Sequence, residues 1–331
     1  MKSTFIYFLF FAFLLSSGSA IATPTLPELA DKPAAKYKTA KVLVEDCPRK
    51  EKYCKGRRQW DDGSSYEGEF KYGEPHGWGT FNWMDGAIFI GEFKDGLRAG
   101  HGQQTFGNGD TYAGEWKLGY MHGKGVYDWV DGSKYVGTFV RGKMEGKGIL
   151  TLPNGESYDG EWKNGLADGS GEFSKVDGSN HLGKYKTGKR HGSGIISWRN
   201  GDIFIGKWKN GNMNKKGTFQ FNNGDKYYCI WEEGEMTGEA TYIHVNGREF
   251  NGDPHSIERA IEDDEELKEA IGPNLGLTWY AIALEYMEKR DFSKAKENFN
   301  YAKRYIAPSS ELNKLIHQQM KIINKHQDDD L

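Results

Sequence analysis

Residues 112–125 read YAGEWKLGYMHGKG, and this pattern returns along the chain with a period of 23 residues. Starting from Tyr66, eight further steps of 23 reach an aromatic residue seven times and a histidine once. The eight positions are Phe89, Tyr112, Tyr135, Tyr158, His181, Phe204, Tyr227 and Phe250. A fixed period kept over eight copies without an insertion is the signature of a repeat architecture.

Three more columns stay in phase with this first aromatic residue. A glycine follows two residues later, at Gly68, Gly91, Gly114, Gly137, Gly160, Gly183 and Gly206. A second aromatic residue follows four later, at Phe70, Phe93, Trp116, Phe139, Trp162, Tyr185, Trp208 and Trp231. Because strand side chains alternate between faces, the two aromatic residues and the glycine share one face of a strand. The glycine leaves a gap on that face, and we expect a ring of the neighbouring repeat to lie over it.

The residues between the strands favour tight turns. A glycine closes each first strand, as in Asp95-Gly96 and Asn164-Gly165, and such pairs favour the positive φ angles of a two-residue hairpin turn. The second strand begins at a Gly-x-Gly, such as Gly123-Lys124-Gly125, and then alternates again. Each 23-residue unit is therefore predicted to be one β-hairpin.

This pattern resembles the MORN repeat (membrane occupation and recognition nexus) over residues 60–252. The resemblance implies a mainly β protein: an elongated, single-layer antiparallel sheet of about sixteen strands in which each hairpin touches only its neighbours. Two departures stand out. The histidine column keeps only His76, His122 and His191, and the eighth copy carries Cys229 and Ile230 in place of Gly-Glu, which predicts an irregular hairpin there.

The N-terminus is typical of a secretory signal peptide over residues 1–22. An apolar run from Phe5 to Leu15 follows Lys2, and Ala20-Ile21-Ala22 offers cleavage after Ala20 or Ala22. An uncleaved anchor is the alternative. Residues 23–46 are expected to be a flexible lead-in to an array spanning residues 47–252.

The cysteines fit an oxidising compartment. Cys47 and Cys54 are seven residues apart, which favours a local disulfide that caps the first edge of the sheet. Cys229 is expected to be a small buried residue.

Helix-forming composition begins after Pro254. Residues 256–270 predict a short acidic helix that ends before Gly272-Pro273. Further on, Trp279, Ile282, Ala283 and Tyr286 share one helical face, and Ala295, Phe299 and Ala302 share another. Residues 254–325 thus resemble a helical domain around one tetratricopeptide (TPR) repeat, and residues 326–331 are expected to be a disordered acidic tail. The TPR resemblance implies a partner-binding groove lined by Leu277, Tyr280, Leu284 and Met287, unless these side chains pack on the preceding helix or the last hairpin.

The sequence holds no recognisable catalytic constellation, metal site or cofactor site. The glycine-rich stretches lack the Lys-Ser/Thr ending of a phosphate-binding loop, and the recurrent glutamates at Glu69, Glu92, Glu115 and Glu161 follow the repeat, as expected of solvated charge. The net charge of −3 gives no bulk attraction to nucleic acid. Some aromatic rings are expected to stay exposed, since nothing obvious covers a single-layer sheet.

These observations predict a non-enzymatic protein–protein interaction scaffold outside the cytoplasm, periplasmic or secreted, with the sheet and the helical cap as docking surfaces. Two alternatives remain. One is a phospholipid or membrane-surface binding module, which the family name implies but which lacks a sustained basic stripe, since lysine replaces the recurrent glutamate only at Lys184 and Lys207. The other is a binder of cell-envelope carbohydrate through exposed aromatic rings.

Overall fold

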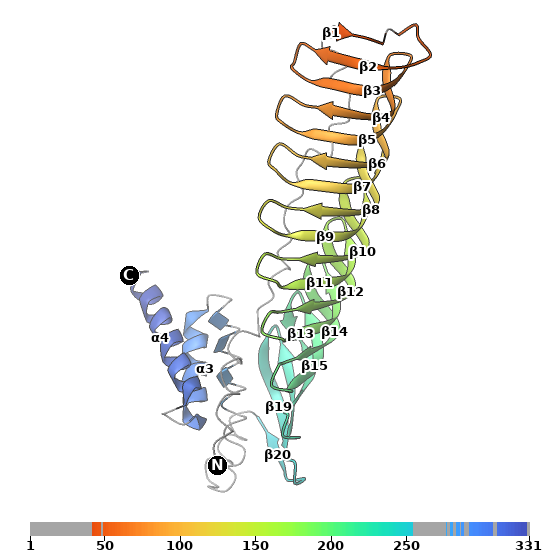
Figure 1. Cartoon of the computed structure of the whole chain (residues 1–331). Coiled ribbons are helices and arrows are strands. Elements are labelled where there is room, and N and C mark those ends of the chain that lie inside the picture. The colour runs from red at the N-terminus through yellow and green to blue at the C-terminus, as the bar shows by residue number, and fades with distance from the viewer. Residues whose placement is uncertain are drawn as a thin grey trace, which may run out of the picture. The chain divides into compact units, whose positions relative to one another are not determined.

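The computed structural model describes residues 42–253 except 48, and in the C-terminal part residues 276, 279–280, 283–284, 286–287, 291–306 and 310–329. The fold is a 20-stranded antiparallel sheet of hairpins that follow one another along the chain, and then α-helices (Figure 1). The expected mainly β class is confirmed. The predicted signal peptide, the acidic helix over 256–270, Leu277 and Ile282 lie outside the described residues.

The chain divides into two compact units with a boundary at residues 173 and 174. The first contains β1 (Val42–Glu45), β2 (Tyr53–Trp60), β3 (Ser65–Lys71), β4 (Glu74–Asn82), β5 (Ile88–Lys94), β6 (Leu97–Thr105), β7 (Thr111–Lys117), β8 (Tyr120–Asp128), β9 (Lys134–Val140), β10 (Lys143–Thr151), β11 (Ser157–Lys163) and β12 (Leu166–Ser174).

The second unit contains β13 (Asn180–Lys186), β14 (Lys189–Ser197), β15 (Ile203–Lys209), β16 (Asn212–Met213), β17 (Lys215–Gln220), β18 (Lys226–Glu232), β19 (Glu235–Ile243), β20 (Glu249–Gly252), α3 (Phe292–Tyr305) and α4 (Glu311–Asp329). The side chain of Asp291 caps α3 by accepting a hydrogen bond from the backbone N–H of Lys294. Ala295, Phe299 and Ala302 are buried on one face of α3, as predicted. Helix α4 continues to Asp329, into the segment that was expected to be disordered.

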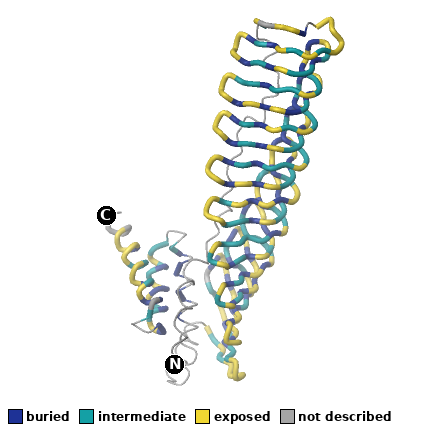
Figure 2. Tube along the Cα trace, in the orientation of Figure 1, coloured by how far each residue is buried: buried dark blue, intermediate teal, exposed yellow. Residues whose placement is uncertain are grey.

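Burial alternates along the strands, so the sheet has an inner face that carries the aromatic columns and an outer face opposite (Figure 2). All sixteen side chains of the two columns from Tyr66 to Trp231 are buried. The rings cover one another edge to face: Tyr112 lies 5.2 Å from Trp116 and 5.1 Å from Phe139 of the next repeat, measured between centroids. Within the two columns no ring stays exposed, because each hairpin supplies the cover for its neighbour. The aromatic residues that do stay exposed lie outside these columns, at Tyr53, Tyr72, Trp78 and Tyr228.

The glycine column provides the space for these rings. A Cβ added to Gly137 would lie 2.4 Å from the Tyr135 hydroxyl and 2.7 Å from the Cα of Gly148 on the paired strand. The ring that requires the glycine thus belongs to the same repeat, not to the neighbouring one as predicted. The hydroxyl of Tyr135 donates to the carbonyl of Thr138, and Tyr112 does the same to Glu115.

Both predicted kinds of turn are present. The hairpin ends at Asp95-Gly96 and Asn164-Gly165 have positive φ at both central residues, as expected for two-residue turns. At the other end of each repeat, Asp or Asn accepts a hydrogen bond from the backbone N–H two residues on, as Asp131 does from Ser133.

Leu118 occupies the first central position of the two-residue turn between β7 and β8, at φ +52. Its side chain is exposed, and as a leucine it cannot form the local hydrogen bonds with which asparagine stabilises this backbone conformation. Because asparagine adopts the left-handed region more easily than leucine, we expect Leu118→Asn to raise the free energy of unfolding by about 1 kcal/mol. Urea unfolding followed by tryptophan fluorescence measures it. Val130→Asn, at a similarly exposed apolar position without positive φ, is the control and should give no gain.

The irregular hairpin lies in the seventh repeat rather than the eighth. There the second strand is split into β16 and β17, because Lys215 stands where other repeats have glycine and adopts φ +67. In the eighth repeat, the hairpin β18–β19 has a register shift between Tyr228 and Ile230 of the kind that the other hairpins also have. Cys229 is buried in the glycine column, where it accepts a hydrogen bond from the indole N–H of Trp231.

The array also begins earlier than predicted. Strand β1, inside the expected lead-in, pairs antiparallel with β2. The buried guanidinium of Arg58 ties this strand to the first hairpin by binding the Glu45 carboxylate and the backbone carbonyls of Cys47 and Gly73. Cys47 and Cys54 lie close together, with 6.0 Å between their Cα atoms, a separation that suits the expected disulfide.

Candidate functional site: the outer face and its supports

The inner face of the sheet is a closed core, so the side chains available for contact lie on the outer face. Aliphatic side chains are exposed there at the middle of the strands. In the first unit they are Ile90, Val136 and Ile149, and in the second unit they are Leu182, Ile195 and Ile205. Val136 and Ile149 are opposite each other in the β9–β10 register. The outer face therefore presents apolar rows that run across the strands.

The recurrent glutamates of the outer face are more than solvated charge. The carboxylates of Glu92, Glu115 and Glu161 accept hydrogen bonds from the backbone N–H groups of His101, Lys124 and Ser170 at 2.9, 2.8 and 2.6 Å. These N–H groups belong to the central residue of each Gly-x-Gly, next to the point where the strand register shifts. The glutamates thus satisfy donors that the ladder leaves unpaired.

A second set of side chains, the buried aspartates that follow the turn glycines, connects the loop at the end of one repeat to the corresponding loop of the next. Asp110 accepts hydrogen bonds from the Tyr127 hydroxyl and from the backbone N–H of Val130, twenty residues further along the chain. Asp202 bonds the N–H of Asn222 in the same way, and burial raises the pKa of Asp202. Sequence reasoning missed this column, although these aspartates immediately follow the turn glycines at a spacing of 23 or its multiples.

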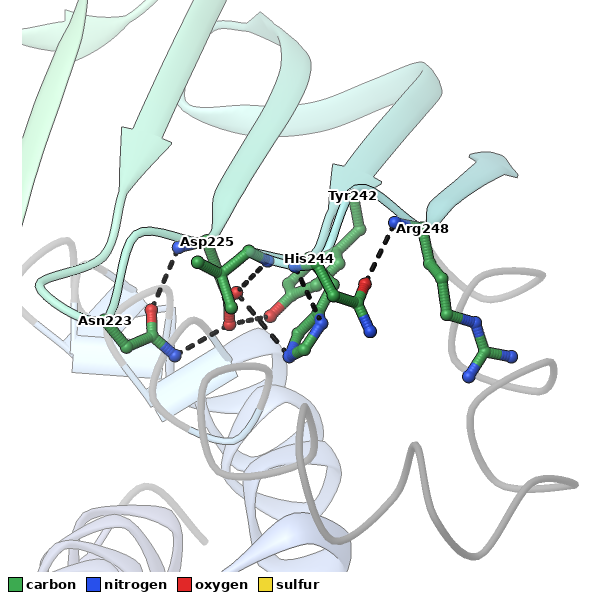
Figure 3. A network of polar contacts seen from close by, with 7 residues as sticks. Asn223, Asp225, Tyr242, His244 and Arg248 are labelled. Atoms are coloured by element: carbon green, nitrogen blue, oxygen red, sulfur yellow. Dashed lines mark hydrogen bonds and ion pairs between the residues drawn. The ribbon is translucent and has the colours of Figure 1, made fainter.

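Asp225 has the most complete of these networks (Figure 3). Its buried carboxylate accepts from the Tyr242 hydroxyl at 2.6 Å, the Asn223 amide at 2.7 Å and the Val245 N–H at 2.8 Å. The imidazole of His244 lies 3.9 Å away. Both carboxylate oxygens thus accept hydrogen bonds from local donors, so this cluster holds the last loops together.

The predicted groove of the helical part is not open at the positions that can be placed. Tyr280 and Leu284 are buried, and Met287 is partly buried against the same apolar cluster. The ring of Tyr280 packs on Phe299 of α3 at 5.6 Å. The placed side chains are thus part of a buried apolar cluster, and the ring contact of Tyr280 is with the following helix α3 rather than with the preceding helix or the last hairpin.

The described residues contain no group of three or more His, Cys, Asp or Glu side chains that could hold a metal ion. Within the same part of the chain, no helix is long and apolar enough to cross a bilayer. His76 and His122 belong to the hairpins, where the imidazole of His76 accepts from the N–H of Asp95 at 3.4 Å.

The repeat geometry agrees with the comparison to known families. The MORN repeat family matches seven consecutive segments: residues 66–88, 89–111, 112–134, 135–157, 158–180, 182–203 and 204–226. The chain is a MORN-repeat protein. MORN repeats are binding repeats rather than enzymes, which agrees with a protein- or membrane-binding module. The eighth copy, which starts at Tyr227, is present in the structure as a strand of the sheet, but it lies outside the matched segments. The two helices α3 and α4 give the TPR resemblance only loose support.

Solved structures similar to this MORN-repeat protein share little sequence with it. A mutant TCP10 domain of Danio rerio CPAP is 14% identical, with a TM-score of 0.36, and the match covers 59% of this chain and 91% of that one. The SAS-4 TCP domain of Drosophila melanogaster in complex with a proline-rich motif of Ana2 is 15% identical, with a TM-score of 0.25 and coverages of 53% and 83%. At TM-scores below 0.5, neither similarity says what this chain binds. No curated protein matches the chain significantly.

Proposed function

We propose that this MORN-repeat protein is a non-enzymatic scaffold that acts outside the cytoplasm and binds proteins through the outer face of its sheet. The observation that supports this most is the difference between the two faces of the sheet. The inner face uses its aromatic columns as core, while the outer face presents exposed aliphatic and charged side chains in fixed cross-strand rows. A repeat array of this kind offers a broad surface on a preorganised frame.

For the carbohydrate alternative, the rings of the two aromatic columns are buried and cannot stack on sugars, which leaves only the separate exposed rings of Tyr53, Tyr72, Trp78 and Tyr228. The membrane alternative still lacks an extended basic surface, because Glu69, Glu92, Glu115 and Glu161 are spread over the outer face of the first unit.

Cross-linking in the native compartment, followed by mass spectrometry, tests the scaffold directly. We expect the mature chain to cross-link to specific proteins through outer-face lysines. We also expect no measurable co-sedimentation with anionic liposomes at about 0.15 M salt, the ionic strength at which exposed charges are well screened. Strong liposome binding without protein cross-links would replace the scaffold by a membrane module.

The location has its own test. If the chain is exported, the mature protein begins near Ile21 or Thr23, and Cys47 and Cys54 are oxidised. We therefore expect thiol labelling of the denatured, unreduced protein to modify Cys229 only, and labelling after reduction to modify all three cysteines. An intact Met1 together with three labelled cysteines before reduction would exclude export.

A further inference from the structure

The second unit concentrates positive charge on hairpins β13–β17. Residues 180–221 contain seven lysines and two arginines against one acidic residue, Asp202, in a chain whose net charge is −3. Asp202 is buried, so it does not offset the lysines at the surface. The exposed lysines of this segment include Lys184, Lys186, Lys207, Lys209 and Lys216. Lys184 and Lys207 stand in the column where other repeats carry the recurrent glutamate.

An apolar row runs beside these lysines. Leu182 is opposite Ile195, and Ile195 is opposite Ile205, in the registers of β13–β14 and β14–β15. Their exposed fractions are 54%, 37% and 45%. Lys184 and Lys207 lie two residues further along the same strands as Leu182 and Ile205. They face the same way, because the strand period is two. We call the Leu182, Ile195 and Ile205 row with Lys184, Lys207 and Lys216 the basic band.

The dimensions of the basic band fit a helix. Neighbouring strands are about 4.8 Å apart, so the aliphatic side chains follow one another at about that spacing across the strands. Successive turns of an α-helix are 5.4 Å apart, so a helix lying across β13–β15 can place one apolar residue per turn on this row. The lysines lie about 7 Å from the aliphatic row, measured along the strands. Acidic side chains on the flank of the same helix would therefore come within reach of them.

The basic band is narrow, and this argues against a flat anionic surface as its ligand. On the next strands, β18 and β19, Glu232 and Glu239 are exposed. A membrane lying on the outer face would meet these two carboxylates together with the lysines. A single helix over β13–β17 would contact the apolar row and the lysines without reaching β18 and β19.

We propose that the basic band is the docking surface for an acidic amphipathic helix of a partner protein. The partner helix carries apolar residues at positions i, i+4, i+7 and i+11, with glutamates or aspartates along one side of that stripe. This proposal rests on the scaffold function and assigns it a site and a class of ligand.

The test measures binding of a synthetic helical peptide to the full mature chain by fluorescence anisotropy. The probe is an 18-residue peptide with leucines at i, i+4, i+7 and i+11 and glutamates on their flank. A second peptide has the same composition but distributes the leucines around the helix. We expect the first peptide to bind at least tenfold more tightly than the second.

Variants locate the site. The double variant Lys207→Glu with Lys216→Glu should bind the first peptide at least tenfold more weakly than the wild type does, and Ile205→Ser should bind it severalfold more weakly. The matched control is Lys124→Glu with Lys147→Glu, at exposed outer-face positions of the first unit, and it should change binding less than twofold. Circular dichroism and thermal unfolding confirm that each variant is folded.

Each remaining outcome decides the proposal. Equal binding of both peptides would show a patch that attracts any polyanion. Binding of phosphatidylserine vesicles but not of the peptide would show a lipid site, and no binding of any probe would remove the site altogether. All three overturn the proposal. The scaffold function fails separately, if the wild-type chain forms no protein cross-links; cross-links that persist in Lys207→Glu with Lys216→Glu would keep the scaffold and move its site elsewhere.

Discussion

Replacing Gly137 by alanine is expected to lower the free energy of unfolding by about 3 kcal/mol, the upper end of what overpacking costs. The added methyl group would lie 2.4 Å from the hydroxyl and 2.5 Å from Cζ of Tyr135, and 2.7 Å from the Cα of Gly148. The Tyr135 ring cannot simply move aside, since it packs on Phe139 at 5.1 Å and on Trp162 of the next repeat at 5.3 Å. Urea unfolding of Gly137→Ala and of the wild type provides the measurement.

Two controls separate the causes. Lys163→Ala, at the exposed last position of β11, should cost almost nothing. Gly165→Ala meets no atom within 4 Å but sits at φ +84, so it reports backbone strain without a clash and should cost less than Gly137→Ala. In a Tyr135→Leu background the cost of Gly137→Ala should shrink, because the obstructing ring is gone. A cost that is the same in both backgrounds would show that the ring is not the obstacle.

The period of the sequence predicted the hairpins because each column encodes a local need. The glycine at each hairpin end adopts the positive φ that a two-residue turn requires, as at Gly96 and Gly165. Alternation along the strand likewise predicted which side chains share a face, and the burial of Tyr112 and Trp116 agrees. Properties that depend on a few consecutive residues were therefore accessible from the sequence.

Properties that depend on a partner in another strand were not. The Glu115 carboxylate bonds an N–H nine residues away, and Asp110 bonds one twenty residues away. The columns are visible in the sequence, but the distance between partners depends on the strand register and its shifts. Strand β1 was missed for a related reason. Its pairing with β2 is reinforced by the buried guanidinium of Arg58, and the residues around Val42 contain no sequence pattern that predicts this contact.

His181 illustrates how one departure from a column changes the behaviour of the array. It replaces the tyrosine or phenylalanine of the other repeats and keeps their packing, with its ring 4.9 Å from Trp208 and edge-on to it. Its Nδ1 lies 2.6 Å from the Tyr185 hydroxyl, and only 5% of the residue is exposed. Burial, together with the nearby charge of Arg190, lowers the pKa of His181 from 6.5 to about 3.

This shift predicts a loss of stability in mild acid. Below pH 6.5 the unfolded chain binds a proton at His181, whereas the folded chain stays neutral there until the pH approaches 3, so the unfolded state is favoured as the pH falls through this window. Between pH 7 and pH 5 the expected loss from this one residue is about 2 kcal/mol. His181→Phe restores the ring used at Phe89 and Phe204, and we expect this variant to lose that part of the pH dependence. His101→Gln, at an exposed imidazole that packs in no aromatic column, should keep the wild-type pH dependence. Urea unfolding of the three proteins at pH 7 and pH 5 measures the difference, and a full wild-type loss in His181→Phe would show that the acid sensitivity arises elsewhere in the array.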